Sequence, residues 1–365
     1  MKKDFDTVRV ELGPDSYDIV IGRNAWNNLP EFVAKKEYSR NALIVTDTNV
    51  GPLYAEKVKS LLAQAGIRAA VAAVPAGEAS KSLTVAEEVF TRAIEGGLDR
   101  RSPVIALGGG VVGDLGGFIA AAYMRGVPFI QIPTSLLADV DSSVGGKVAV
   151  NHRLGKNLIG AFYQPEGVFI DLDCLKTLPP REISTGLGEI IKYGIISDGE
   201  LFAYLEKNSQ AVKALDLEAI RRLILRSCQI KAEVVSRDEK ESGLRRILNY
   251  GHTMAHAVEK EAGYGRYNHG EAVAIGMVCA AHIGAALKLS DEGLLERIEE
   301  LCRRLGLPTR VENCAVDKMY AAIFHDKKTV NGVVSWVLAP CLGETVITGD
   351  VPEEIVKAAM AYCCA

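Results

Sequence analysis

The sequence predicts an α/β domain followed by a mainly helical domain. In the first half, short apolar runs of strand length alternate with runs that have helical spacing, whereas after about residue 177 long stretches with helical spacing dominate. The chain has 365 residues, which is too long for one ordinary hydrophobic core and suits two. We therefore expect a Rossmann-like α/β domain over residues 1–177 and a helical domain over residues 178–365.

The predicted α/β domain alternates strands with helices in order along the chain. Strands are expected within residues 42–47, 67–77, 103–110 and 127–135, and helices within residues 49–66 and 81–97. Gly66 should end the first of these helices, and Gly-Gly follows the second. This order of elements indicates a parallel sheet that is flanked by helices.

The predicted helical domain begins at the proline pair 179–180. Long helical patterns follow within residues 179–208, 216–239, 269–289 and 290–306. Asp216 should cap the second of these helices, and Ser290 and Gly306 should start and stop the last. The pattern over 269–289 is rich in Gly and Ala, so we expect this helix to lie close against its neighbours. A ligand site between the two domains is the default expectation.

Composition excludes several classes of protein. The formal charge is -4 with a pI near 6.0, and no Lys/Arg-rich run is present, so a nucleic-acid partner is not expected. No stretch reaches the roughly 18 apolar residues of a membrane span, and no signal peptide opens the chain. The eight cysteines form no CxxC pair, which is typical of reduced thiols in a cytoplasmic protein. Cys363 and Cys364 weakly suggest metal or redox chemistry, but we expect a frayed tail.

A glycine loop follows the predicted strand at residues 103–107. Gly108–Gly110 end the strand, and Gly113 comes next, before the expected start of a helix. Glycines let the backbone approach a pyrophosphate, and a helix N-terminus offers free N–H groups. The acid that usually stands about 20 residues downstream is missing, although Asp47, Glu78 and Lys81 lie near other strand ends. A nucleotide site and a glycine turn that serves packing alone both remain open.

Cations in glycine-rich surroundings cluster within residues 133–160. Lys147 follows Gly-Gly, and Lys156 stands between Gly and Asn157, with Asp141 nearby. Such lysines suggest a phosphate or carboxylate that is held by point charges and backbone groups. Solvated surface charge is the alternative, and it applies more strongly to the other cations. These are Arg125, Lys231, Arg245 and the run 326–328.

Two histidines, His252 and His256, stand four residues apart, as metal ligands on one helix face often do. Residue 253 is Thr, so the glutamate of a HExxH zinc protease is absent, and an ordinary helix face stays possible from this stretch alone. His269 and Glu189 add to His252 a His₂Glu set of the kind that binds catalytic zinc. Glu189 falls on an apolar helix, where an unpaired carboxylate would be costly.

Other polar residues of the helical domain have different expected roles. Lys192 follows Glu189 at i+3, on the same helix face. His256 would then neighbour the site without being a ligand, and His282 is expected to be a satisfied core histidine. His152 and His325 have no clear role.

The sequence resembles the 3-dehydroquinate synthases of the sugar phosphate cyclase family over nearly the whole chain. The motifs that carry the resemblance are GGGVVGDLGGF, YMRG, VDSSVGGKVAVN, GKNLIGAFYQP, GEIIKYG, LNYGHTMAHAVE, HGEAVAIGM and DKK. The resemblance implies an N-terminal NAD-binding α/β domain and a C-terminal helical domain, usually in a homodimer. It also implies NAD⁺ and a divalent metal, usually zinc, with cobalt often accepted.

The resemblance assigns a role to each matching residue. The implied metal ligands are Glu189, His252 and His269. The implied catalytic residues are His256, Lys147, Lys192 and Asp141. The implied substrate-binding residues are Arg125, which would reach the phosphate from the partner subunit, and Lys156, Asn157, Lys231, Arg245, Asn249 and Lys327. The implied NAD contacts are Asp47, Asn49, Glu78, Lys81, Gly109, Gly110, Asp114, Thr134, Ser135, Lys147, Lys156, Thr177 and Glu182.

The activity that the resemblance implies is a carbon–oxygen lyase reaction of the shikimate pathway, which leads to chorismate and the aromatic amino acids. Its substrate would be the sugar phosphate 3-deoxy-D-arabino-heptulosonate 7-phosphate, and its products 3-dehydroquinate and phosphate. Oxidation at C5 by NAD⁺, β-elimination of phosphate, re-reduction and an intramolecular aldol closure make up the reaction. The protein would be cytoplasmic.

Four positions depart from the commoner family pattern. They are Asp139, Gly188, Ala255 and Trp336. Three other functions share this architecture: cyclases that make inososes or valiolones, metal-dependent alcohol dehydrogenases of the glycerol dehydrogenase type, and NAD-binding proteins without activity. The cyclases are expected to differ around the substrate carboxylate and phosphate. All the residues expected there are present, which favours a substrate with a carboxylate; they are Lys231, Arg245, Asn249, His256 and Lys327. The buried metal set argues against an inactive protein.

Overall fold

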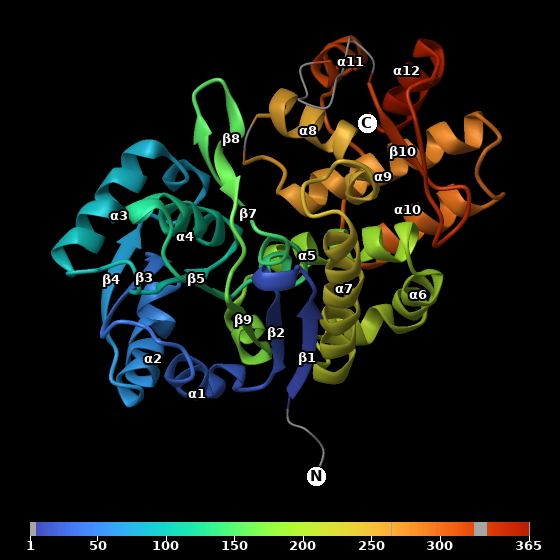
Figure 1. Ribbon diagram of the computed structural model, residues 1–365. Coiled ribbons are helices and arrows are strands. Elements are labelled where there is room, and N and C mark those ends of the chain that lie inside the picture. Colours follow the sequence, from blue (N-terminus) through green and yellow to red (C-terminus); the bar gives the residue numbers. More distant parts are fainter. Residues whose placement is uncertain (1–4, 264, 325–333, 365) are drawn as a thin grey trace. The chain divides into compact units, whose positions relative to one another are not determined.

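The computed structural model describes residues 5–263, 265–324 and 334–364, and the chain divides into two compact units (Figure 1). Unit 1 comprises Met1–Leu178 and Ser227–Lys240, and unit 2 comprises Pro179–Arg226 and Glu241–Ala365. Helix α7 (Leu217–Arg237) therefore begins in unit 2 and ends in unit 1. The expected single boundary after residue 177 does not anticipate this return of the chain.

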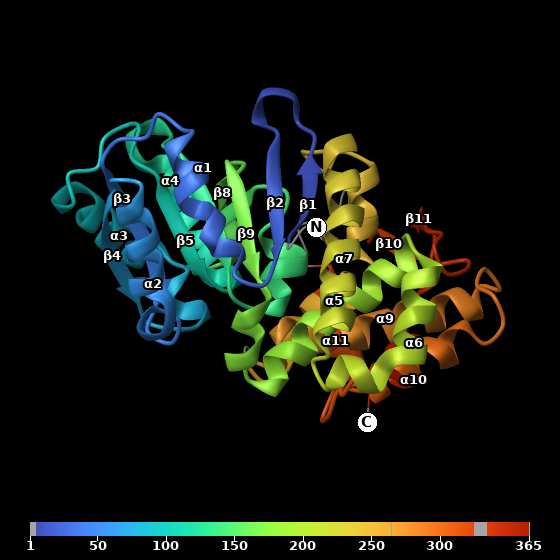
Figure 2. The same cartoon turned by 90° about the horizontal axis from the view of Figure 1, so that it is seen from below.

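A seven-stranded sheet forms the centre of unit 1, in the order β1-β2-β9-β6-β5-β3-β4. Its strands are β1 (Phe5–Val10), β2 (Tyr17–Gly22), β3 (Asn41–Asp47), β4 (Arg68–Val74), β5 (Val104–Gly108), β6 (Phe129–Pro133) and β9 (Gly167–Asp171). Only β1 runs antiparallel to its neighbour, β2, and Figure 2 shows the turn between these two strands extending past the rest of the sheet. The predicted parallel sheet is confirmed.

Helices cover both faces of the sheet because its buried strands point alternate side chains to opposite sides. Ile44 and Ile105 face one core with α1 (Leu29–Ala34) and α2 (Gly51–Gln64). The next residues along, Val45 and Ala106, face a second core. That core also contains α3 (Leu83–Glu95) and α4 (Gly110–Ala122).

Glycines let helix α4 lie very close to its surroundings. A Cβ atom on Gly116 would lie 2.9 Å from the Ala106 Cβ, and one on Gly117 would lie 2.2 Å from the Val148 Cγ1. Helix α4 already begins at Gly110, so the expectation that Gly113 precedes the helix is wrong. Gly113, Gly116 and Gly117 therefore lie within the helix, and the last two allow its close packing.

A two-stranded hairpin rises from unit 1 beyond the sheet (Figure 1). It consists of β7 (Lys147–His152) and β8 (Gly155–Phe162), which pair antiparallel. Before it comes a π-helical segment, Ala138–Ser142, and after β9 comes the 3-10 helix Leu172–Thr177. π-helical turns are rare and often occur at functional sites. This one contains Asp139 and Asp141.

Unit 2 is mainly helical, as predicted. Besides the first part of α7 it contains α5 (Pro180–Ile196), α6 (Gly199–Lys213), α8 (His252–Glu261), α9 (His269–Ala286), α10 (Leu294–Arg304), α11 (Val316–Ile323), α12 (Glu353–Tyr362) and the hairpin of β10 (Trp336–Leu338) with β11 (Val346–Thr348). Asp216 caps α7 as predicted, because its Oδ1 accepts a hydrogen bond of 2.9 Å from the Ala219 N–H. Trp336, one of the departures, is buried.

Helix α9 is buried around most of its circumference, which confirms the close packing expected from its Gly and Ala content. The start predicted for α10 is wrong. Ser290 donates its hydroxyl to the Ala339 carbonyl (2.7 Å), and the helix begins at Leu294 after Gly293, whose φ is +79°. Gly306 (φ +79°) follows the end of α10 as predicted.

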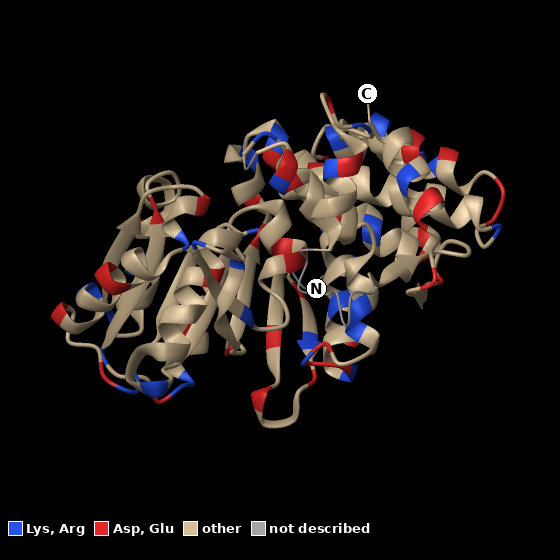
Figure 3. Ribbon diagram, turned by 90° about the horizontal axis from the view of Figure 1, so that it is seen from above, with Lys and Arg blue, Asp and Glu red and all other residues tan. Residues whose placement is uncertain are grey.

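Charges of both signs are interspersed along the ribbons of both units (Figure 3). Ion pairs between neighbouring helical residues, such as Glu300 with Arg304 at 2.9 Å, account for part of this pattern. Among the described residues no helix is long and apolar enough to cross a membrane.

The C-terminal cysteines correct two expectations. Cys314 and Cys364 form a disulfide, so the thiols are not all reduced, and Cys363 is buried, so the tail is not frayed.

His282 is not the satisfied core histidine that was expected. Its Nδ1 has no hydrogen-bond partner among the described residues, and burial together with Arg310 lowers the pKa of its ring.

Asp139, another departure, lies in the π-helical segment with 1% of its surface exposed. Its Oδ1 has no hydrogen-bond partner within the described part of the chain. Burial raises the pKa of this carboxyl well above its usual value of 3.8, and the charge of Asp171 adds to the effect. The protonated form of Asp139 is therefore more strongly favoured in the folded protein than in the unfolded chain.

Thiol titration tests the disulfide. Protein that is purified without reductant and then unfolded should expose six reactive thiols per chain, and eight after reduction, because two of the eight cysteines are joined. Cys314→Ser should expose seven thiols in both states. Eight thiols in the unreduced parent protein would contradict the bond.

The buried Asp139 should make stability depend on pH. A carboxyl whose folded pKa is raised destabilises the fold increasingly as pH rises from 3.8 towards that folded value, by about 1.4 kcal/mol per pH unit. The Tm of Asp139→Asn minus that of the parent should therefore increase as the pH is raised above 3.8. The exposed Asp15→Asn is the control and should show a constant difference. A constant difference for Asp139→Asn too would refute the account.

Candidate active site

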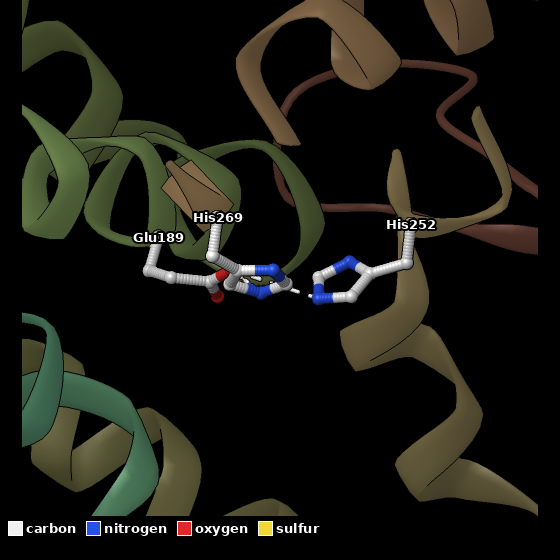
Figure 4. Close-up of side chains that lie close together, drawn as sticks. All are labelled: Glu189, His252 and His269. Atoms are coloured by element: carbon white, nitrogen blue, oxygen red, sulfur yellow. Dashed lines mark ion pairs between the residues drawn. The ribbon is translucent and has the colours of Figure 1, made fainter. Parts of the chain in front are cut away.

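Three residues of unit 2 meet to form a candidate metal centre (Figure 4). Glu189 lies on α5, His252 is the first residue of α8, and His269 is the first residue of α9. Their ligand atoms all lie within 4.8 Å of one another, and the Nε2 atom of each histidine is 3.6 Å from Glu189 Oε1. The structure therefore brings together the three residues predicted as metal ligands.

Glycines beside these residues allow the helices that carry them to approach closely. A Cβ atom on Gly188 would lie 2.6 Å from the Gly270 carbonyl oxygen, and one on Gly270 would lie 1.9 Å from the Thr185 carbonyl oxygen. A Cβ atom on Gly276 would likewise lie 1.9 Å from the carbonyl oxygen of Gly251. Each of the three candidate ligands is thus next in sequence to a glycine in such a contact. Glycine at position 188, one of the four departures, therefore allows the close contact between α5 and Gly270.

The electrostatics of the cluster suit a cation. The Glu189 side chain is fully buried, and although Lys192 pairs with its Oε2, its Oε1 has no hydrogen-bond partner in the described ranges. A buried carboxylate oxygen without a partner is costly unless a cation neutralises it. Burial favours the neutral ring of His269, but Glu189 and Glu259 raise its pKa to about 10. Two imidazoles and one carboxylate are a common donor set for catalytic zinc.

His256 lies one helical turn after His252 on α8, with the two ring centroids 5.9 Å apart. It is half-buried and is not one of the three clustered residues. The arrangement agrees with its expected place beside the metal set, from which a ring nitrogen could exchange a proton with a bound hydroxyl. Its catalytic role remains a prediction.

In unit 1, most predicted NAD contacts follow the ends of parallel strands. Asp47 ends β3, Glu78 follows β4, Gly109 follows β5, and Thr134 follows β6. Because these four strands are parallel neighbours, their carboxyl ends share one edge of the sheet. This edge is where open α/β sheets bind ligands.

The backbone at this edge is held by local hydrogen bonds. Asp47 Oδ1 accepts from the N–H groups of Asn49 (2.8 Å) and Val50 (2.9 Å), at the start of α2. Gly109 precedes the first turn of α4, and a Cβ atom on it would lie 3.3 Å from Ser135 Oγ. The first N–H groups of α4 thus lie at the strand ends, as an anion site requires. Gly109 and Gly110 therefore lie at a helix N-terminus, whereas Gly116 and Gly117 allow the close packing of α4.

Sequence reasoning missed Asn151, which joins three predicted site residues. Its Nδ2 donates to Glu78 Oε1 (2.7 Å), its N–H to the Lys81 carbonyl (2.8 Å), and its Oδ1 accepts from the Asn157 N–H (2.9 Å). The sequence did offer one signal for Asn151, because this polar residue directly follows the apolar run 148–150 in β7. Lys81 also pairs with Asp114, and burial raises the pKa of that carboxyl although Lys81 opposes the rise.

The predicted substrate cations of unit 1 lie in different surroundings. Lys231 is buried in the part of α7 that belongs to unit 1, and its Nζ donates to both the carbonyl oxygen and Oδ1 of Asp141, at 2.6 Å each. Lys147 begins β7, and Lys156 lies on β8. Arg125 is exposed after α4 with φ +69°. Lys231 and Asp141 are thus a predicted pair that lies in direct contact.

Other predicted residues have structural partners of their own. Thr177 shares a hydrogen bond of 2.6 Å with the Tyr54 hydroxyl in unit 1. In unit 2, Glu182 accepts from Asn268, the residue that caps α9 (2.9 Å), and Asn249 donates to Glu241 (2.7 Å). Arg245 is buried in the 3-10 helix Leu244–Asn249. Lys327 and His325 lie outside the described residues.

Comparison with known proteins accounts for this combination of sites. Two family models, described as 3-dehydroquinate synthase N-terminal and C-terminal, match residues 71–185 and 186–329. A curated 3-dehydroquinate synthase of Desulforamulus reducens is 50% identical over 356 residues, which are 97% of this chain and 99% of the relative. The chain belongs to the 3-dehydroquinate synthase family. The resemblance inferred from the motifs is confirmed.

Solved structures of related cyclases share the fold. A 2-epi-5-epi-valiolone synthase from Streptomyces hygroscopicus, described with NAD⁺ and Zn²⁺ bound, is 31% identical with a TM-score of 0.88, and 97% of each chain is covered. A 2-deoxy-scyllo-inosose synthase, described as a complex with carbaglucose-6-phosphate, NAD⁺ and Co²⁺, is 25% identical with a TM-score of 0.89, and the match covers 98% of this chain and 100% of that one. The predicted fold class of the 3-dehydroquinate synthase family is confirmed.

Metal binding tests the cluster on α5, α8 and α9. Glu189→Ala, His252→Ala and His269→Ala should each weaken Zn²⁺ binding by about 100-fold or more, because each removes one of three donor atoms. His256→Ala should keep zinc yet lose turnover. Equilibrium dialysis followed by elemental analysis measures the zinc content. Retention of zinc by His269→Ala together with its loss from His256→Ala would reverse the assignment.

Proposed function

We propose that this protein is a 3-dehydroquinate synthase. It would convert 3-deoxy-D-arabino-heptulosonate 7-phosphate to 3-dehydroquinate and phosphate, as a carbon–oxygen lyase of the shikimate pathway that supplies chorismate and the aromatic amino acids. One observation carries the proposal: a curated protein of this name is 50% identical over 97% of the chain. The relatives described as valiolone and inosose synthases are less similar, at 31% and 25% identity.

The proposed cofactors are NAD⁺ and a divalent metal, Zn²⁺ or Co²⁺. When bound, they would supply a hydride acceptor and a Lewis acid for the substrate hydroxyl. The glycine-rich strand ends of unit 1 support the nucleotide, and the buried Glu189 Oε1 between two imidazole nitrogens supports the metal. Both cyclase structures described above are named with NAD⁺ and one of these metals.

The proposed reaction changes the substrate in a fixed order. Its C5 alcohol is oxidised to a ketone, which acidifies the neighbouring C6–H, and phosphate leaves by β-elimination. The ketone is then reduced, the ring opens, and an intramolecular aldol reaction closes the carbocycle. His256 would take and return the C5 hydroxyl proton at a ring nitrogen, with Lys147 and Lys192 as supporting cations and Asp141 holding Lys231. The leaving phosphate itself would remove the C6 proton.

The remaining cations are proposed to bind the two anionic ends of the substrate. Lys231, Arg245 and Asn249 would hold the carboxylate, which gains charge-assisted hydrogen bonds. Lys156, Asn157 and Lys327 would stabilise the leaving phosphate. The full NAD contact set of the sequence analysis is proposed without change.

Assembly and location complete the proposal. The protein would act as a cytoplasmic homodimer, with Arg125 reaching the phosphate in the partner subunit's site. The exposure of Arg125 on unit 1 supports a contact beyond its own unit. Mixing inactive Arg125→Ala with inactive His252→Ala protein would test the shared site, since a mixed dimer holds one complete site.

The decisive test is the fate of the hydride. A lyase returns it to the substrate, so NAD⁺ is needed only in catalytic amounts. With NAD⁺ well below the heptulosonate phosphate, released phosphate should far exceed total NAD⁺ while the absorbance at 340 nm stays nearly flat. 3-Dehydroquinate should form in step with phosphate.

Two outcomes would reject the proposal. A rise at 340 nm that matches product one for one would identify a dehydrogenase, which has no need to hold a leaving phosphate. Faster turnover of a sugar phosphate that lacks the carboxylate would favour a different cyclase. His256→Ala serves as the matched control, because it should keep the metal but release no phosphate.

A further inference from the structure

The two histidines of the metal set are each approached by an oxygen atom on the side away from Glu189. Both turn Nε2 towards Glu189 Oε1, at 3.6 Å. The Nδ1 atom of His252 lies 3.1 Å from the carbonyl oxygen of Tyr250, whereas Nδ1 of His269 lies 3.8 Å from Oε1 of Glu259. One ring therefore faces a neutral backbone oxygen and the other a carboxylate.

Glu259 occupies the helix face that already carries the site. On α8 it follows His252 by seven residues and His256 by three, so all three side chains share one face. Only 12% of the Glu259 side chain is exposed. A carboxylate enclosed to this degree requires a donor or cation, and His269 is within ion-pair distance.

The backbone of His269 is fixed independently of Glu259. Asn268 and Glu271 form a capping box at the start of α9, in which Glu271 Oε2 accepts from the Asn268 N–H at 2.8 Å. This box sets the position of the His269 Cα atom but leaves the rotation of its ring undetermined. The ring has one ion-pair contact at each nitrogen, Nε2 with Glu189 at 3.6 Å and Nδ1 with Glu259 at 3.8 Å.

We propose that Glu259 is a positioning residue for His269. From ion-pair distance its negative charge stabilises a proton on Nδ1, and this favours the tautomer whose Nε2 lone pair faces Glu189 and the divalent metal. A carboxylate partner also makes the imidazole a stronger donor than a carbonyl partner does. The inference rests on the metal site of the proposed function. Loss of such a supporting partner typically weakens metal binding by about 10- to 100-fold.

The test compares Glu259→Ala and Glu259→Gln with the exposed Glu261→Gln, which removes the same charge from the same helix. Zn²⁺ affinity is measured by competition with a chromophoric chelator. Glu259→Ala should bind Zn²⁺ about 10- to 100-fold more weakly than the parent. Glu259→Gln keeps an oxygen acceptor and should lose less, and Glu261→Gln should match the parent.

Further measurements separate positioning from folding. The metal-free Tm of Glu259→Gln should match that of Glu261→Gln, and its Co²⁺ complex should show a changed visible spectrum because the His269 ring is reoriented. Equal Zn²⁺ affinity of Glu259→Ala and Glu261→Gln would overturn the inference while leaving the metal site intact. A parent protein that binds no Zn²⁺ would overturn both.

Discussion

Close contact between backbones underlies the metal set of unit 2. Helix α9 touches α5 through Gly188 and Gly270 and touches the entry to α8 through Gly251 and Gly276, at distances that no side chain would permit. Since each candidate ligand adjoins one of these contacts, helix packing determines how far apart the ligand atoms lie. A site placed on packed helices needs little reorganisation when it binds a cation.

Unit 1 depends on a different constraint, the shared carboxyl edge of its parallel strands. Loops that leave neighbouring strands at one edge gather side chains from distant parts of the sequence without any packing between those side chains. Two residues then hold the loops in place. Asp47, the last residue of β3, accepts from the N–H groups of Asn49 and Val50 just before α2, and Asn151 joins the hairpin to the segment of Glu78. The predicted ligand-binding groups of this unit therefore lie on short polar loops at one edge of an apolar sheet.

Periodicity and chemistry predicted much of this arrangement, and tertiary contacts account for the rest. The strand ending at Asp47 and the helix beginning at His269 were evident because apolar spacing sets local structure. Glu189 was recognisable because a carboxylate on an apolar helix needs a partner. By contrast, Ser290 looked like a cap but bonds to a distant carbonyl, and Asn151 matters only through residues that are remote in sequence. Such pairings are invisible until the chain is folded.

The disulfide has a consequence for the unfolded chain as well as for the folded one. It closes a loop of 50 residues that contains α11, β10, β11 and α12. A cross-link over that separation lowers the conformational entropy of the unfolded ensemble and stabilises the fold by about 4 kcal/mol. Since α12 packs against α9, detachment of the C-terminal helix is disfavoured in the oxidised chain. The thiol–disulfide balance of the surroundings thus becomes a thermodynamic variable for the helical unit.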